Sequence, residues 1–108
     1  MKISELFSSW RCWIKNSYAR VTRSRRDDVN PSYSAATCWC LAGAVKKCYP
    51  AHEWGAVATC LGATIKELFP HRVKGISDGS WWDIIIKFND AKSTRFADVL
   101  RVVKHAKV

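Results

Sequence analysis

The strongest constraint on the fold is a helical repeat of apolar residues that lies between two prolines, Pro50 and Pro70. Proline suits the first turn of a helix, and a later proline disfavours helical geometry in the residue before it. Between the two prolines, apolar side chains recur three or four positions apart, at Trp54, Val57, Ala58, Leu61, Ile65, Leu68 and Phe69. The spacing therefore predicts a helix over residues 51–69 with one buried face.

Three other segments show the same helical spacing of apolar residues. We expect helices over residues 3–18 and 34–48, and a last helix that begins after Ser93 or Thr94. The second of these helices would be capped by Ser32 or Ser34, because serine oxygens accept hydrogen bonds from the first N–H groups of a helix. The sequence thus predicts about four helices.

Residues 81–88, with the sequence WWDIIIKF, favour a β-strand because aromatic and β-branched side chains dominate them. A lone strand leaves its backbone groups without partners. The strand would pair with residues 73–76 as a hairpin or wrap the helices as an extended segment; otherwise the strand interpretation is mistaken. For 108 residues we expect a single domain over 1–108, α+β and mostly helical, with a small strand or hairpin element near 73–88.

Charge is the feature that says most about partners. The chain has 18 Lys+Arg against 9 Asp+Glu, a net charge of +9. This excess favours a negative partner, either nucleic acid or an acidic protein surface, although it also serves solubility alone. The apolar runs are too short for a membrane span, the first residues do not resemble a signal peptide, and five cysteines are an odd number. We therefore expect a protein of the reducing cytoplasm, without a membrane partner.

The stretch TCWCLAGAV, residues 37–45, allows three interpretations: a metal site, a catalytic thiol or the inside of a packed helix. A zinc site is disfavoured, because Cys38 and Cys40 would point in nearly opposite directions from a helix. The other Cys/His pair is interrupted by Pro50. A buried cysteine behaves as a small apolar side chain, which is the simplest interpretation of this stretch. We expect no metal and no cofactor.

A catalytic thiol is the enzymatic alternative. Cys40 near a helix start would have a lowered pKa, because the helix dipole favours the thiolate. Asn89 or Asp90 would orient the histidine that acts as the base. The chain offers three histidines for that role: His52, His71 and His105. Only the residue types support this arrangement, so Cys40 is a weak candidate for a cysteine-dependent hydrolase and a non-enzymatic protein is preferred.

The polar segment of residues 19–32 is the main candidate for a binding surface, because four arginines fall between Arg20 and Arg26. Tryptophan and arginine are typical of hot spots in protein interfaces, and tryptophans beside arginines also stack on bases. No helix-turn-helix, RNP or GxxG motif is present, so a protein partner is preferred and nucleic-acid binding through the arginine cluster is the alternative. The expected binding residues are Trp10, Trp13, Arg20, Arg23, Arg25, Arg26, Trp81 and Trp82.

Several motifs together resemble a family of small bacterial and bacteriophage proteins that has no established activity. Residues 33–45, YSAATCWCLAGAV, contain Trp-Cys-x-x-Gly-Ala, and FND at residues 88–90 supplies an aromatic-Asn-Asp motif before a threonine and a valine-bearing helix. Phe88 stands where the family more often has tryptophan. The matching residues are Trp39, Cys40, Gly43, Ala44, Asn89, Asp90, Thr94 and Val99.

The resemblance implies a compact, mostly helical or α+β domain in a phage or prophage setting, and hence the cytoplasm of a bacterial host cell. It also favours a structural core that consists of Trp39, Cys40, Gly43, Ala44, Asn89 and Asp90. In this core, Gly43 and Ala44 are small enough for a close helix contact, while Asn89 and Asp90 would reach across to cap the helix. The leading hypothesis is a small basic binding protein that acts on a host or defence protein.

Overall fold

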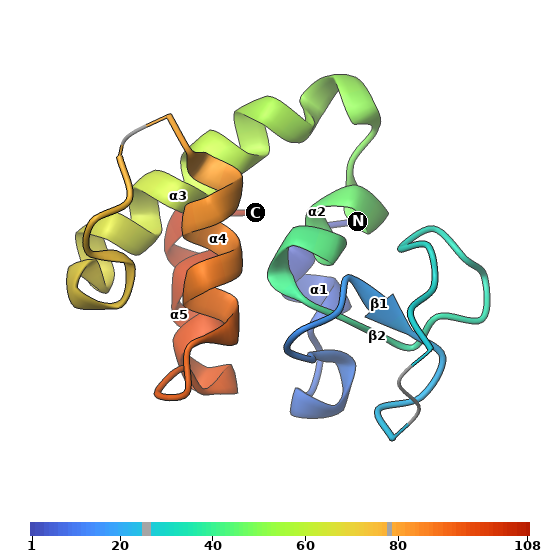
Figure 1. Cartoon of the computed structure of the whole chain (residues 1–108). Helices are drawn as coiled ribbons and strands as arrows, with labels where there is room; N and C mark the ends of the chain where they lie inside the picture. The colour runs from blue at the N-terminus through green and yellow to red at the C-terminus, as the bar shows by residue number, and fades with distance from the viewer. Residues whose placement is uncertain (25–26, 78) are drawn as a thin grey trace.

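The computed structural model describes residues 1–24, 27–77 and 79–108. This part of the chain is α+β and mostly helical, which confirms the predicted fold class (Figure 1). None of its helices is both long and apolar enough to cross a membrane. The helices are α1 (Ile3–Leu6), α2 (Leu41–Cys48), α3 (Trp54–Leu68), α4 (Trp81–Asp90) and α5 (Phe96–Ala106), with short 3-10 helices at Trp10–Cys12, Ala51–Glu53 and Pro70–Val73. The strands are β1 (Ala19–Arg20) and β2 (Cys38–Trp39).

Helix α3 is the centre of the helical part and packs against α2, α4 and α5. Leu61 and Ile65, on the face that the spacing predicts, are fully buried. On the same helix, Gly62 allows a close approach of Trp81, because a Cβ at this glycine would lie 2.5 Å from Cε3 of the indole. The helix expected between the two prolines is therefore confirmed, and only its first turn, Ala51–Glu53, is a 3-10 helix.

The predicted strand over residues 81–88 is wrong, because this segment forms helix α4. Ile84, Ile85 and Phe88 are all fully buried. Neighbouring residues such as Ile84 and Ile85 point to opposite faces of a strand, whereas a helix brings them and Phe88 onto one face that packs against α3. β-branched residues lower helix propensity only slightly, and burial of this apolar face outweighs that cost.

The two-stranded sheet pairs a segment that we expected in a loop with one that we expected in a helix. The small strand element predicted near residues 73–88 is therefore in the wrong place. Strands β1 and β2 pair antiparallel, with Ala19 opposite Trp39 and Arg20 opposite Cys38. Because β2 occupies the predicted start of the second helix, α2 begins only at Leu41. Its N-cap is Cys40 and not a serine, and the cysteine Sγ accepts a hydrogen bond from the N–H of Gly43 at 3.3 Å.

The predicted helix over residues 3–18 is much shorter, because α1 ends at Leu6. Ser9 then starts a 3-10 turn, in which its Oγ accepts a hydrogen bond from the N–H of Arg11 at 3.3 Å. Serine favours such caps over helix interiors, since its side chain competes for backbone groups. Asn16 adopts a left-handed conformation with φ 63°, which a continuous helix excludes.

The last helix is confirmed, although its cap differs from the prediction. Helix α5 begins at Phe96, so Arg95 is the N-cap in place of Ser93 or Thr94. The Asp98 carboxylate accepts a hydrogen bond from the Arg95 N–H at 3.0 Å. An acidic side chain in the first turn also interacts favourably with the helix dipole.

Candidate binding site

Asn89, near the end of α4, is the polar centre of the fold, and its side chain is 1% exposed. Its Oδ1 accepts hydrogen bonds from Trp13 Nε1 at 2.7 Å and from the Leu41 N–H at 2.9 Å. Its Nδ2 donates to the Ile14 carbonyl at 3.1 Å. Leu41 is the first residue of α2, so Asn89 caps this helix from another helix while it also holds the N-terminal segment.

Asp90 extends this contact to the next residues of the N-terminal segment. Its Oδ1 accepts hydrogen bonds from the Asn16 N–H and from Asn89 Nδ2, both at 2.9 Å. Beside it, Lys15 Nζ donates to the Ala91 carbonyl at 2.6 Å. Together these bonds attach residues 14–16 to the end of α4.

Gly43 determines how closely the chain around Tyr18 approaches α2. A Cβ at this glycine would lie 1.9 Å from the Tyr18 carbonyl oxygen, so the backbone just before β1 comes into direct contact with the helix. The same carbonyl accepts a hydrogen bond from the Cys40 N–H at 3.3 Å. Trp39 and Ala44, which flank this contact in sequence, are 6% and 0% exposed and lie in the core.

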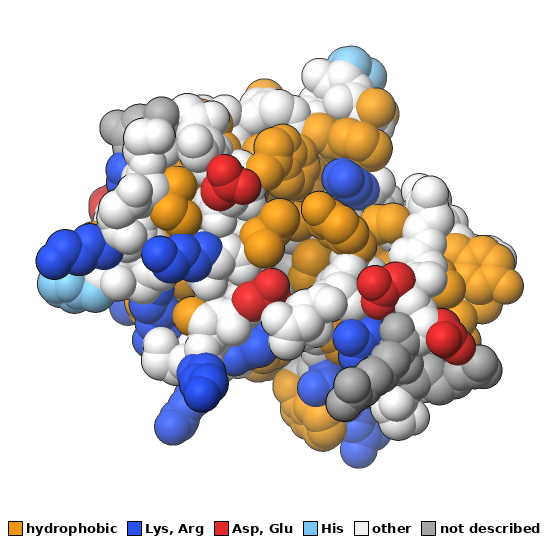
Figure 2. All heavy atoms as spheres, in the orientation of Figure 1, with side chains coloured by type: hydrophobic (Ala, Val, Ile, Leu, Met, Phe, Trp, Pro, Cys, Tyr) orange, Lys and Arg blue, Asp and Glu red, His pale blue; other side chains and the backbone are white. Residues whose placement is uncertain are grey.

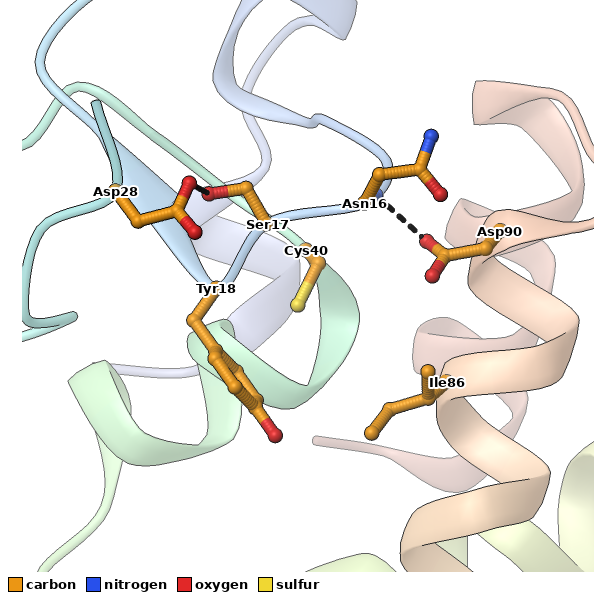
Figure 3. A pocket seen from close by; sticks show the side chains of 7 residues that line it. All are labelled: Asn16, Ser17, Tyr18, Asp28, Cys40, Ile86 and Asp90. Atoms are coloured by element: carbon orange, nitrogen blue, oxygen red, sulfur yellow. Dashed lines mark hydrogen bonds between the residues drawn. The ribbon is translucent and has the colours of Figure 1, made fainter. Parts of the chain in front are cut away.

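A pocket of about 360 Å³ lies between these segments (Figure 3). In Figure 3 the Cys40 thiol, the Tyr18 ring and Ile86 are directed toward one space, with carboxylates on opposite sides of it. Among the described residues, no lysine, arginine or histidine lines the pocket. The lining consists of Asn16, Ser17, Tyr18, Asp28, Cys40, Ile86 and Asp90.

Cys40 is the residue on which an enzymatic function would depend, and its environment does not suit a nucleophile. Burial raises the pKa of the thiol to about 11, although the hydrogen bond from the Gly43 N–H acts in the opposite direction. The expected lowering of this pKa by the helix start is therefore wrong, because desolvation of the thiolate outweighs the effect of the helix. A thiol with this pKa stays protonated near neutral pH and is a poor nucleophile.

The cysteines and histidines do not converge elsewhere in the described part of the chain. Its residues include no group of three His, Cys, Asp or Glu side chains placed to hold a metal ion. All five cysteines are free thiols. Cys38 lies in β2, buried, and its Sγ is 3.6 Å from the Arg20 carbonyl. The buried cysteines, Cys38 and Cys40, pack as small side chains, whereas Cys60, which we expected to be buried in the same way, is exposed.

Three aromatic rings next to the pocket surround the ammonium group of Lys46. Its Nζ lies 4.7 Å from the ring centroid of Tyr18, 5.4 Å from that of Trp54 and 5.7 Å from that of Trp82. Tyr18 also lines the pocket, and Ile86 lies one helical turn after Trp82, so pocket and rings share one face. Figure 2 shows hydrophobic side chains gathered on this face, with carboxylates at their border. We call Tyr18, Lys46, Trp54, Trp82 and Ile86 the aromatic surface.

A second exposed aromatic site is centred on Trp10, which is 54% exposed. The guanidinium carbons of Arg11 and Arg23 lie 5.5 and 4.9 Å from its ring centroid. Arg23 also donates hydrogen bonds to the main-chain carbonyls of Trp10 and Trp13. We call Trp10, Arg11 and Arg23 the Trp10 surface.

The predicted binding tryptophans separate into different environments. Trp13 is 7% exposed and bonded to Asn89, so it belongs to the core and is not available to a partner. Trp81 is half-buried against α3 at Gly62. Trp10 is the centre of the Trp10 surface, and Trp82 belongs to the aromatic surface.

The predicted arginine cluster has internal partners where the structure describes it. Arg20 lies on β1 and its Nε is 3.8 Å from Asp28 Oδ1. Arg23 bonds the main-chain carbonyls described above, and it keeps its contact with Trp10. Arg25 and Arg26 lie outside the described residues.

Sequence reasoning did not identify most of the residues that form these sites, among them Arg11, Tyr18, Asp28 and Lys46. Arg11 follows Trp10 directly, so their adjacency in sequence was an available signal. Tyr18 and Lys46 meet only because β1 turns back onto α2, and no periodic pattern encodes this contact. Asp28 lies beside the pocket because its backbone forms an isolated antiparallel β-bridge with Arg20. No sequence pattern predicts the path of the loop that brings it there.

The fold and these sites define a small, mostly helical α+β protein with a carboxylate-lined pocket. The chain belongs to a family of unknown function, DUF6197, whose sequence profile matches residues 5–107. This match confirms the resemblance to an uncharacterised family of small proteins. No curated protein and no solved structure matches the chain.

Proposed function

We propose that this protein is a small, basic, non-enzymatic binding protein that docks on an acidic surface of another protein through the Trp10 surface. One observation carries the proposal: the Trp10 ring is 54% exposed, with the guanidinium groups of Arg11 and Arg23 beside it. Tryptophan and arginine are the residue types that most often dominate binding energy at interfaces. The net charge of +9 complements an acidic partner and accelerates association with it.

Arg23 is already ordered for this role. Its hydrogen bonds to the Trp10 and Trp13 carbonyls hold the guanidinium group next to the ring. A partner therefore meets a preformed pair, and little side-chain entropy remains to be lost on binding.

The environment of Cys40 supports a binding function over hydrolysis, because the thiol is buried and its pKa is raised. The motifs shared with small bacterial and bacteriophage proteins support a phage or prophage origin. In that setting the partner is a host or defence protein in the cytoplasm of the bacterial cell.

Nucleic-acid binding by the same surface is the second candidate. An exposed tryptophan beside guanidinium groups also suits the stacking of single-stranded bases. Arg20 of the predicted cluster pairs with Asp28, which leaves one charge fewer for phosphates. For this reason the protein partner is preferred.

The Trp10→Ala variant tests the proposal in an affinity capture from bacterial cells. Tyr33→Ala is the matched control, because Tyr33 is a comparably exposed aromatic residue, at 50%. We expect a protein that the wild type and Tyr33→Ala retain and that Trp10→Ala loses. With the purified partner, Trp10→Ala should raise Kd about tenfold, and added salt should weaken the wild-type complex.

Two outcomes would contradict the proposal. Equal capture by all three proteins would show that the Trp10 surface is not the interface. A labelled single-stranded RNA or DNA whose salt-sensitive binding depends on Trp10, without any protein partner, would establish the nucleic-acid candidate instead.

A further inference from the structure

We infer that the pocket between residues 16–18 and α4 receives an arginine side chain from a segment of a partner protein, whose apolar neighbours lie on the aromatic surface. The pocket is separate from the Trp10 surface, so this inference is independent of the proposed function. Its volume of about 360 Å³ is within the range of sites that enclose a small ligand or one long side chain.

The polar groups of the pocket call for a ligand rich in hydrogen-bond donors. Asp90 uses Oδ1 for the Asn16 N–H and for Asn89, and no described residue donates a hydrogen bond to its Oδ2. Asp28 Oδ1 accepts a hydrogen bond from the Ser17 hydroxyl at 2.5 Å. A guanidinium group carries five N–H donors in a planar fork, which suits acceptors that stand on different sides of a pocket.

The charges of the pocket favour a cation. The lining has two carboxylates, Asp28 and Asp90, and no described lysine or arginine. This is unusual in a chain with twice as many basic as acidic residues. Three cations stand nearby. Arg20 already pairs with Asp28 at 3.8 Å, whereas Lys15 donates to the Ala91 carbonyl and Lys46 lies among the aromatic rings. The ligand's positive charge therefore complements chiefly Asp90, for which the described residues form no ion pair.

The apolar walls favour arginine within a longer segment. The ring of Tyr18, which is 44% exposed, offers a face on which a guanidinium plane stacks. Beyond it, the half-buried side chains of Trp82 and Ile86 follow one another along α4. Apolar residues on either side of the partner's arginine would cover these side chains.

The test titrates the full-length protein with the blocked tripeptide acetyl-Leu-Arg-Leu-amide and follows amide shifts by two-dimensional NMR. We expect saturable shifts at residues 16–18 and around Ile86 and Asp90, with a millimolar Kd. The peptides with Gln or Glu in place of Arg should bind about tenfold more weakly or not at all.

Asp90→Asn should weaken binding of the arginine peptide about tenfold. Asp83→Asn is the matched control, because it removes the same charge from an exposed position of α4 and should leave the Kd unchanged. Where Asp90→Asn loses its native spectrum, Asp28→Asn replaces it, since this side chain is 67% exposed and should weaken binding about threefold.

The absence of saturable shifts at the pocket, an equal response to the Glu peptide, or an unchanged Kd in the folded pocket variant would each overturn the inference. Trp10→Ala should bind the arginine peptide as the wild type does. A failure of the pocket test is therefore distinguishable from a failure of the Trp10 surface.

Discussion

The N-terminal part of the molecule, residues 1–40, and the helical part, residues 41–108, are held in their positions by different interactions (Figure 1). In the helical part, apolar side chains of α3, α4 and α5 pack together at helical spacing, and many are fully buried. In the N-terminal part, the described residues 1–24 and 27–40 form regular structure only as α1, one 3-10 turn and two strands of two residues each. The N-terminal part also buries apolar side chains such as Ile3 and Phe7 in the core, but with so little regular structure its backbone groups need other hydrogen-bond partners.

In the N-terminal part, side-chain hydrogen bonds provide many of the partners that helices and sheets would otherwise give to the backbone. A chain with few helices and strands leaves buried N–H and C=O groups that still require partners. Asn89 bonds the Ile14 carbonyl and the Trp13 indole N–H, Asp90 bonds the Asn16 N–H, and Arg23 bonds the carbonyls of Trp10 and Trp13. Trp39 contributes twice, because its Nε1 donates to the Pro31 carbonyl and its own carbonyl accepts from the Ile14 N–H.

The largest expected effect is at the contact between the two parts, in Gly43→Ala. The new Cβ would overlap the Tyr18 carbonyl oxygen, so either the backbone at Tyr18 or α2 must move. We expect a loss of about 3 kcal/mol in the free energy of unfolding, measured by urea denaturation. Gly55→Ala on α3 is the control, because its Cβ would meet no atom within 4 Å and should stabilise the helix by up to about 1 kcal/mol. Similar losses in both variants would contradict the close contact.

Asn89→Ala should separate the two parts more specifically. It removes the hydrogen bonds to Trp13, Leu41 and Ile14, at an expected cost of about 2 kcal/mol. In hydrogen exchange, the amides of residues 13–20 should lose more protection than those of α3. Asn30→Ala, in an exposed turn, should change stability by less than about 1 kcal/mol. A uniform loss of protection along the chain would mean that Asn89 does not hold the N-terminal part in particular.

The smallest effect concerns a polar contact inside the helical part, between Arg72 and Asp98. Burial tends to raise the pKa of Asp98, but hydrogen bonds from the Arg95 N–H and from Arg72, at 2.7 Å, outweigh it and lower the pKa below its ordinary value. A carboxylate with a lowered folded pKa stabilises the protein above its unfolded pKa, and this stabilisation disappears as pH falls through the folded value.

Asp98→Asn should therefore cost on the order of 1 kcal/mol at neutral pH, measured by thermal or urea unfolding. The difference from the wild type should disappear in acid as pH falls through the lowered folded pKa of Asp98, because the wild-type carboxyl then becomes protonated as well. Asp83→Asn should show no comparable difference at either pH. A difference that persists in acid would assign the effect of Asp98 to shape and not to charge.

The helical part was largely predictable from sequence, because its apolar spacing is the physical cause of its packing. Helices α3 and α5 follow that spacing directly. Helix α4 did not, since Ile84, Ile85 and Ile86 also satisfy the preference of a strand for β-branched residues. Only their burial against α3 distinguishes the two structures, and that depends on the tertiary fold.

The N-terminal part and the pocket were less predictable, because long-range polar contacts determine them. Trp13 and Asn89 are 76 positions apart in sequence, and a search for helical spacing assigns Trp13 to a helix face. The close contact at Gly43 and Ala44 was predictable, because small residues side by side on a helix indicate the approach of another backbone. The pocket was not, since Tyr18, Asp28 and Asp90 come together only after the fold has formed.

The walls of the pocket belong to both parts of the molecule, and this has a thermodynamic consequence. Residues 16–18, Asp28 and Cys40 come from the N-terminal part, while Ile86 and Asp90 come from α4. Any molecule that occupies the pocket must bind the docked arrangement more tightly than a separated one, and so raise the midpoint of thermal unfolding as its concentration rises. A substitution that loosens the docking, even far from the pocket, should weaken the uptake of that molecule in proportion to the fraction of docked protein that is lost.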